Sequence, residues 1–192
     1  MKMFCLMFLV LLSGSFGPAN AEPVAADERI PVDVRRTTLL VRDIDKSLPL
    51  YRDALGLKVI YDQKIGAGKN PDGSAKAATT RLVLLRANDT FIGALGLMQR
   101  LGEPQPKRRK NARTVAGDAI VVINASDLDS RWAKIKATPH IEVHTAPTRI
   151  EYPAADGGVI PVMFSAVFDA DGHFIEINQI LGAPAGTPAK KE

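Results

Sequence analysis

Apolar and polar positions repeat in the same order at two places along the chain. In each copy a strand pattern, beginning at Leu39 or Ile123, is followed by an aspartate, Asp43 or Asp127, that is suited to cap a following helix. Apolar residues follow each aspartate with spacings of four and three, which place them on one helix face. They are Ile44, Leu48 and Tyr51 in the first copy and Leu128, Trp132 and Ile135 in the second. Matching caps and matching apolar positions predict a duplicated unit.

Three segments with the pattern of β-strands follow each helix. The strands are expected at 57–62, 79–86 and 91–99 in the first half, and at 141–144 with an extension left open, 159–168 and 173–179 in the second. Gly56 is expected to end the first helix in a left-handed conformation. The run Asp169–Gly172 predicts a tight turn, because glycine accepts positive φ. Each half is therefore expected to be a strand, a helix and three further strands.

The chain divides into six expected segments. They are a signal peptide at 1–21, an N-terminal extension at 22–32, a first module at 33–101, a basic proline-containing linker at 102–116, a second module at 117–180 and a flexible tail at 181–192. Lys2, an apolar run over 3–12 and the small residues Ala19 and Ala21 are typical of a cleavable secretory signal. The apolar run is shorter than the roughly 20 residues of a membrane span. We therefore expect a secreted or periplasmic protein that begins near Glu22.

Composition and charge exclude several protein classes. The 192 residues are 46% hydrophobic and 24% charged, as in ordinary globular proteins. A formal net charge of +4 is too small to indicate a nucleic-acid-binding protein. The single cysteine, Cys5, lies in the signal segment, so the mature chain is expected to have neither disulfides nor thiol chemistry. No other segment is apolar enough to predict a stable membrane span.

Three segments carry a family resemblance: Thr38–Ser47, Tyr51–Val59 and Phe168–Ile177. Together they resemble the vicinal oxygen chelate superfamily, which includes glyoxalase I, extradiol dioxygenases, fosfomycin-resistance proteins and bleomycin-binding proteins. The resemblance covers about residues 33–180 and implies an α+β fold of two fused βαβββ modules whose curved sheets enclose a cup. In the metalloenzymes of this superfamily, the cup holds a divalent ion bound by His and Glu side chains.

The metal-ligand pattern that the resemblance implies is mostly missing. The histidine position of the first strand falls on Arg36, and the corresponding position of the second module falls on Ile120. A carboxylate position falls on Gly96, and only Glu176 retains the expected ligand type. One carboxylate does not hold a catalytic metal, which needs about three protein ligands. We therefore predict no cofactor, with a divalent metal bound through Glu176 as the alternative.

The histidines and the glycine-rich segment carry weaker signals. His140 and His144 are four strand steps apart, about 13 Å, which is too far for one ion. We expect them to form a polar, solvent-facing stripe with Glu142, and we expect His173 to be an exposed turn residue. A flexible loop is expected over residues 66–74, because the spacing of a phosphate-binding loop is missing there.

The predicted site combines residues from several strands. Strand alternation places Arg36 and Thr38 on one face of the first strand and Glu176 on one face of the last. The resemblance implies that these two faces line the cup. Asp118 is expected to point to the same side of its strand as Ile120. The predicted ligand-binding residues are therefore Arg36, Thr38, Asp118 and Glu176. Arginine offers a planar pair of donors to a carboxylate, phosphate or enolate oxygen, so we expect Arg36 to take the place of the metal.

Three functions remain open from the sequence. The first is metal-independent binding of a small anionic organic molecule, similar to the bleomycin-binding branch. The second is an enzyme of the same superfamily, a lyase or isomerase similar to lactoylglutathione lyase or a dioxygenase, with a divergent metal site or Glu176 as catalytic general base. The third is a structural or regulatory module whose cup is closed by an Arg36–Glu176 ion pair. A homodimer is left open, because the superfamily closes its cups either within one chain or between two.

Overall fold

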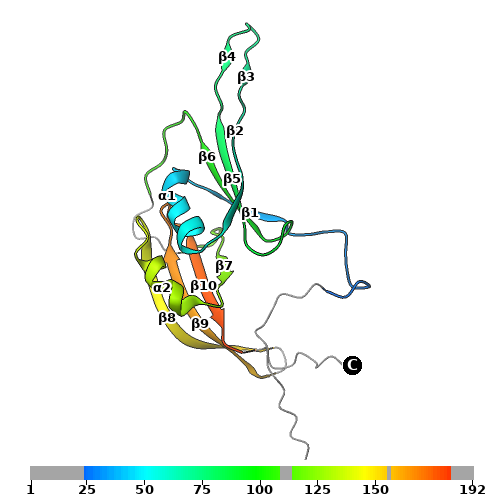
Figure 1. The fold of residues 1–192 in the computed structure, drawn as a ribbon, viewed down its shortest axis with the longest axis vertical. Helices are drawn as coiled ribbons and strands as arrows, with labels where there is room; N and C mark the ends of the chain where they lie inside the picture. Colours follow the sequence, from blue (N-terminus) through cyan, green and yellow to red (C-terminus); the bar gives the residue numbers. More distant parts are fainter. Residues whose placement is uncertain (1–23, 109–113, 155–156, 183–192) are drawn as a thin grey trace, which may run out of the picture.

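The computed structural model describes residues 24–108, 114–154 and 157–182, and the expected signal peptide lies outside them. The first half contains β1 (Arg36–Leu40), α1 (Ile44–Leu48), the π-helical η1 (Pro49–Ala54), β2 (Lys58–Ile65), β3 (Gly68–Lys69), β4 (Ala75–Lys76), β5 (Thr80–Arg86) and β6 (Ala94–Arg100). The second half contains β7 (Val121–Asn124), α2 (Leu128–Lys136), β8 (Glu142–Pro153), β9 (Val159–Phe168) and β10 (Phe174–Ile180), as Figure 1 shows. No helix among the described residues is long and apolar enough to cross a bilayer.

Each half forms a four-stranded sheet with the same topology. The strand orders are β1-β6-β5-β2 and β7-β10-β9-β8. In each sheet the first strand pairs parallel with the last strand of its module, and the other neighbours pair antiparallel. The predicted α+β fold of two βαβββ modules with curved sheets is confirmed.

The first helix begins at its predicted cap. The Asp43 carboxylate accepts a hydrogen bond from the N–H of Asp45 at 3.0 Å, as an N-cap does. The helix then widens into η1 at Pro49, where the N–H of Leu55 donates to the carbonyl of Leu50 at 2.9 Å. Proline has no N–H for an ordinary helical bond, so the widened turn follows from its position.

Asp127 stands at the predicted N-cap position of the second helix, but its side chain does not cap the helix. Asp127 makes no capping hydrogen bond. Its two carboxylate oxygens instead accept from Nε and Nη2 of Arg131 at 2.9 and 2.6 Å. Because the guanidinium engages both oxygens, neither caps the backbone. The apolar helix face is as predicted, since Leu128 and Ile135 are fully buried and Trp132 packs against the core.

The hairpin after the first helix is longer than the sequence predicts. Where a loop is expected, at residues 66–74, β3 and β4 pair antiparallel and extend the β2–β5 hairpin beyond its sheet (Figure 1). The turn at its tip contains Gly73, with φ +84°, and its N–H donates to the carbonyl of Asn70 at 2.9 Å. Gly73 thus lies in a tight turn within a hairpin, and the segment is not an open loop.

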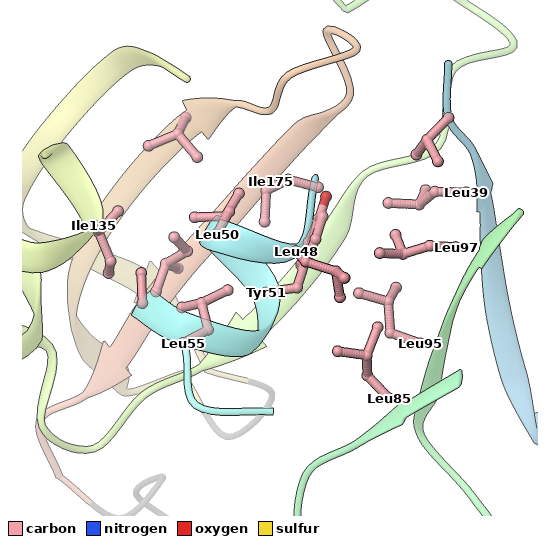
Figure 2. Close-up of a cluster of buried hydrophobic side chains, with 14 of the residues drawn as sticks. Leu39, Leu48, Leu50, Tyr51, Leu55, Leu85, Leu95, Leu97, Ile135 and Ile175 are labelled. Carbon is pink, nitrogen blue, oxygen red and sulfur yellow. The ribbon is translucent and has the colours of Figure 1, made fainter. Parts of the chain in front are cut away.

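One hydrophobic core joins the two modules. Figure 2 shows α1 and η1 between the first sheet and the second module, with Leu50 and Tyr51 among the labelled side chains. Leu39, Leu85, Leu95 and Leu97 of the first sheet and Ile135 and Ile175 of the second module belong to this cluster. Both sheets therefore turn one apolar face toward the helices. We call the opposite faces the outward faces; Arg36 and Thr38 lie on the first and Glu176 lies on the second.

Candidate functional site

Thr38 and Gly96 lie side by side on the first outward face. The β1–β6 pairing places Thr38 opposite Gly96. A Cβ atom at Gly96 would lie only 2.6 Å from Oγ1 and 3.1 Å from Cγ2 of Thr38. Glycine therefore makes room for the threonine side chain. The close contact gives a physical reason why the carboxylate position of the superfamily holds no side chain in this protein.

Arg36 is the cation of the predicted site, and its guanidinium is accessible to a ligand. It is exposed, and it makes none of the hydrogen bonds or ion pairs found among the described residues. It lines a cavity of about 340 Å³ between the edge strands β1 and β7. The cavity is also lined by Val34, Thr37, Leu57, Ala87, Gly93, Ala94, Leu95, Ile120, Val121, Val122, Ile123 and Asn124. Arg36 is the only charged residue in this lining.

Glu176 is held on the second outward face by its neighbour Asn178. Oε2 of Glu176 accepts a hydrogen bond from Nδ2 of Asn178 at 3.1 Å. Asn178 is itself fixed, because its Oδ1 accepts from the backbone N–H of Ser165 on β9 at 3.2 Å. Glu176 is half-buried and lies opposite the small, fully buried residue Ala166. The sheet thus presents one oriented carboxylate on this face.

Asp118 lies apart from Glu176. It is exposed, and its Oδ2 accepts from the backbone N–H of Val115 at 3.0 Å. In the β7–β10 pairing, Val122 is the residue opposite Glu176. β7 begins at Val121, so Asp118 precedes this strand and, contrary to the sequence prediction, does not share its alternation. It lines a different cavity, of about 250 Å³, together with Phe174.

The single chain does not gather the four predicted residues into one cup. Arg36 and Asp118 line separate cavities. Within the described ranges, Arg36 and Glu176 form no ion pair, so the closed pair expected for a disused cup is not formed. Residues 24–108, 114–154 and 157–182 also contain no group of three or more His, Cys, Asp or Glu side chains placed to hold a metal ion. Of the residues at the ligand positions of the superfamily, only Glu176 can coordinate a metal ion, so this set does not fit a centre that needs about three ligands.

A buried polar cluster that the sequence analysis did not predict joins the modules. Asp169 is fully buried, and its carboxylate accepts a hydrogen bond from the Tyr51 hydroxyl at 2.8 Å. It also accepts from the backbone N–H groups of Asp171 and His173, each at 2.9 Å. A tyrosine on the apolar face of a helix was the available signal, because a buried hydroxyl needs a partner.

His173 belongs to this cluster, so the prediction of an exposed turn residue is wrong. Its side chain is 29% exposed, and Nδ1 lies 3.0 Å from Oδ2 of Asp169. Burial disfavours the protonated ring, but the hydrogen bond and the charge of Asp169 outweigh burial and raise the pKa of His173. Burial likewise works against the Asp169 carboxylate, yet hydrogen bonds from His173 and Tyr51 prevail and lower its pKa. Burial and the nearby Asp169 charge raise the pKa of Tyr51.

The predicted turn at Asp169–Gly172 is confirmed, and it docks onto the first module. Gly172 has φ +91°, and its N–H donates to the carbonyl of Asp169 at 3.1 Å. Nε of Arg42 lies 2.6 Å from Oδ1 of Asp171, and Nη2 of Arg42 donates to the carbonyl of Ala170 at 2.6 Å. This turn fastens the second module to the start of α1, so its polar residues serve the fold.

The expected stripe of His140, Glu142 and His144 is wrong at its first member. His140 precedes β8 in a turn and has φ +67°, so it does not share the strand alternation. His144 is on β8, and its ring meets Phe168 and Phe174 edge-on, with centroid distances of 5.7 and 5.2 Å. Its role is therefore aromatic packing as well as solvent contact.

Comparison with known proteins agrees with this architecture. The family model described as the Glyoxalase/Bleomycin resistance protein/Dioxygenase superfamily matches residues 34–177. No curated protein sequence matches the chain. A glyoxalase family protein from Bacillus cereus has a similar structure over 82% of this chain and 100% of its own, with a TM-score of 0.57 and 11% identity.

Two other solved structures are similar at lower TM-scores. Trypanothione-dependent glyoxalase I from Leishmania major is 20% identical over 76% of this chain and 85% of its own, with a TM-score of 0.48. An antibiotic binding protein from Streptomyces sp. is 17% identical over 79% of this chain and 99% of its own, with a TM-score of 0.48. The family model spans most of both modules, and the chain therefore belongs to the glyoxalase/bleomycin resistance protein/dioxygenase superfamily.

Proposed function

We propose that the protein binds a small anionic organic molecule through Arg36, without the metal that is usual in its superfamily. The observation that carries the proposal is the exposed Arg36 guanidinium, which meets no carboxylate among the described residues and borders a largely apolar cavity. Such a guanidinium offers two parallel N–H donors to a carboxylate or phosphate. Family membership supplies the scaffold, while the chemistry is argued from these residues.

Elemental analysis of the purified protein tests the absence of a metal requirement. The protein is purified without a metal-binding tag and incubated with zinc, nickel, manganese and, anaerobically, ferrous iron. We expect no ion near one per chain, because Arg36 and Gly96 occupy positions where ligands are needed. One bound ion per chain that is lost in the Glu176→Ala variant would instead support a divergent metal site and overturn the proposal.

A second candidate function is proton abstraction by Glu176. The observation that favours it is the hydrogen bond from Asn178, which orients a half-buried carboxylate on the second outward face. A carboxylate held in this way suits a general base that removes a proton next to a carbonyl group. Deuterium exchange at carbon 3 of 2-oxobutanoate, followed by NMR, tests it. Exchange that is lost in Glu176→Gln supports the enzyme, and a rate equal to that in buffer excludes this reaction.

The compartment and the assembly are part of the proposal. Residues 1–21 have the pattern of a cleavable signal, so we place the protein outside the cytoplasm. N-terminal sequencing of the purified protein tests this, with Glu22 as the expected first residue. Arg36 and Glu176 lie on the outward faces of different sheets. We therefore propose that a cup containing both residues is completed by a second copy of the chain.

A further inference from the structure

The cavity beside Arg36 lies where the two modules meet. β1 and β6 of the first module line one side, and β7 of the second module lines the other. Its volume of about 340 Å³ is at the lower end of the range for small-molecule sites, roughly 300 to 1,000 Å³. Leu95 belongs to the core that joins the modules, and Leu57, Val121 and Ile123 pack against that core. A ligand there would contact the apolar side chains that hold the modules together.

The cavity has few polar side chains, and they suit the binding of a ligand with one carboxylate group. Besides Arg36, the lining contains one hydroxyl side chain, Thr37, and one amide side chain, Asn124. Neither side chain makes a hydrogen bond with another described residue. One cation and two neutral hydrogen-bonding groups suit one negative charge, because further charges on a ligand would be buried without partners.

The backbone at the cavity is also available. Among the described strands, β1 pairs only with β6 and β7 pairs only with β10, so both are edge strands. The carbonyl of Arg35 accepts from Ala94 of β6, and the N–H of Val41 donates to Met98 of β6. Backbone groups of successive residues in a strand alternate between its two sides. The N–H of Arg36 therefore lies at the unpaired edge and adds a donor beside its guanidinium.

Two other hollows of the described chain offer less. Both carboxylates of the cavity lined by Asp118 already have partners: Asp118 accepts a hydrogen bond from the N–H of Val115, and Asp171 forms an ion pair with Arg42. The hollow beside Arg42 and Lys46 is polar, and these cations already pair with Asp171 and Asp43. The cavity between β1 and β7 combines an available cation with an apolar lining.

We propose that this cavity binds an amphipathic monocarboxylate, with the carboxylate on Arg36 and an aliphatic or aromatic body among Leu95, Val121 and Ile123. The inference names the ligand class of the proposed function and rests on it for the role of Arg36. A neutral apolar molecule would cover the guanidinium without a counter-charge, which is unfavourable. Because the lining comes from both modules, the ligand bridges them and raises the melting temperature.

Calorimetric titration of the purified protein with octanoate and with phenylpropanoate tests the inference. We expect one site per chain and an increase in melting temperature at saturation. Octanol and octylamine have the same chain length without the negative charge, and we expect them to bind at least about tenfold more weakly. Equal binding of octanol and octanoate overturns the inference.

Two arginine variants separate the site from general charge. Arg36→Ala is expected to weaken octanoate binding by about 10- to 100-fold, as the loss of a charged hydrogen bond does. Arg35→Ala is the matched control, because Arg35 lies over the Phe91 ring at 5.0 Å and does not line the cavity. We expect it to bind octanoate as the unchanged protein does. An equal loss in both variants contradicts a specific role of Arg36.

Two further variants test the apolar part of the cavity. Ala94→Leu fills the space beside Arg36 without removing the charge, and we expect it to abolish binding. Val122→Glu adds a negative charge, the same sign as the ligand's carboxylate. Because Val122 is 60% exposed, we expect the variant to fold normally and its new side chain to repel the ligand. Unchanged octanoate binding in a folded Val122→Glu variant overturns the inference.

Hydrophilic anions distinguish this inference from the proposed function. Succinate and phosphate carry negative charge without an apolar body. If they bind in an Arg36-dependent manner and the two amphipathic carboxylates do not, the inference is wrong and the proposed function stands. If no anion shows Arg36-dependent binding, both are wrong.

Discussion

At the level of single residues, the candidate site differs from the superfamily's metal centre at two positions, Arg36 and Gly96. Arg36 places a permanent positive charge where the superfamily resemblance puts a histidine. Gly96 removes a side chain where it puts a carboxylate, and Thr38 fills the space that results. The two changes support each other, because a carboxylate at position 96 would collide with Thr38 and would neutralise Arg36. Replacing Gly96 alone by a carboxylate residue is therefore expected to destabilise the first sheet, because the new side chain would collide with Thr38.

The contact between Gly96 and Thr38 yields a prediction about stability. Gly96→Ala is expected to lower the free energy of unfolding by about 1–3 kcal/mol, because the new Cβ lies 2.6 Å from the Thr38 Oγ1 atom. Thr38→Ala removes Oγ1 and Cγ2, so the double variant is expected to recover most of the loss. Urea unfolding of the two single variants and the double variant measures this coupling. Additive losses would show that Thr38 does not restrict position 96.

At the scale of elements, short-range patterns predicted the strands and helix faces well. The limits of β9 at 159 and 168 agree with the sequence, and Gly56 ends the helical segment with φ +76° as expected. The misses at η1 and at β3–β4 have local causes. Pro49 interrupts the helical hydrogen bonding, and a tight turn at Gly73 lets β3 and β4 pair.

The site was only partly predictable for a different reason. Strand alternation correctly separates Arg36 and Glu176 from the apolar faces of their strands. Alternation does not reveal how two sheets pack, and the cavity beside Arg36 arises from that packing. The Asp169 cluster was missed similarly, because Tyr51 and Asp169 are 118 residues apart in the chain. Contacts of this kind depend on the tertiary arrangement.

The docked turn between β9 and β10 yields a prediction about pH. The pKa of His173 is raised above its ordinary value of 6.5, so the folded state binds the proton more tightly than the unfolded state. The resulting stabilisation is complete below about pH 6.5 and is lost as the pH rises through the folded-state pKa. We expect His173→Gln to remove this decrease in the free energy of unfolding, measured by urea unfolding from about pH 5.5 to 8.5. His144→Gln, at an exposed residue, is the control and should retain it.

At the scale of the whole molecule, the packing of the modules leaves exposed residues on both outward faces. Both sheets use one face for the shared helical core. The first outward face carries Arg36 and Leu40, and Leu40 is 53% exposed. The second outward face carries Glu176 and Val122, and Val122 is 60% exposed. Each outward face thus carries one charged residue of the predicted site, Arg36 or Glu176, and exposes an apolar residue.

These faces predict a homodimer in which the first sheet of one copy meets the second sheet of the other. A two-fold axis would form this contact twice, and it would place Arg36 and Glu176 of different copies on the walls of one shared cup. We expect light scattering to give about twice the mass of one chain. Leu40→Lys adds a charge within the contact and is expected to yield monomers. Val24→Lys, at a residue outside both sheets that is 58% exposed, should remain dimeric. An unchanged protein that is monomeric under all conditions would contradict the predicted homodimer.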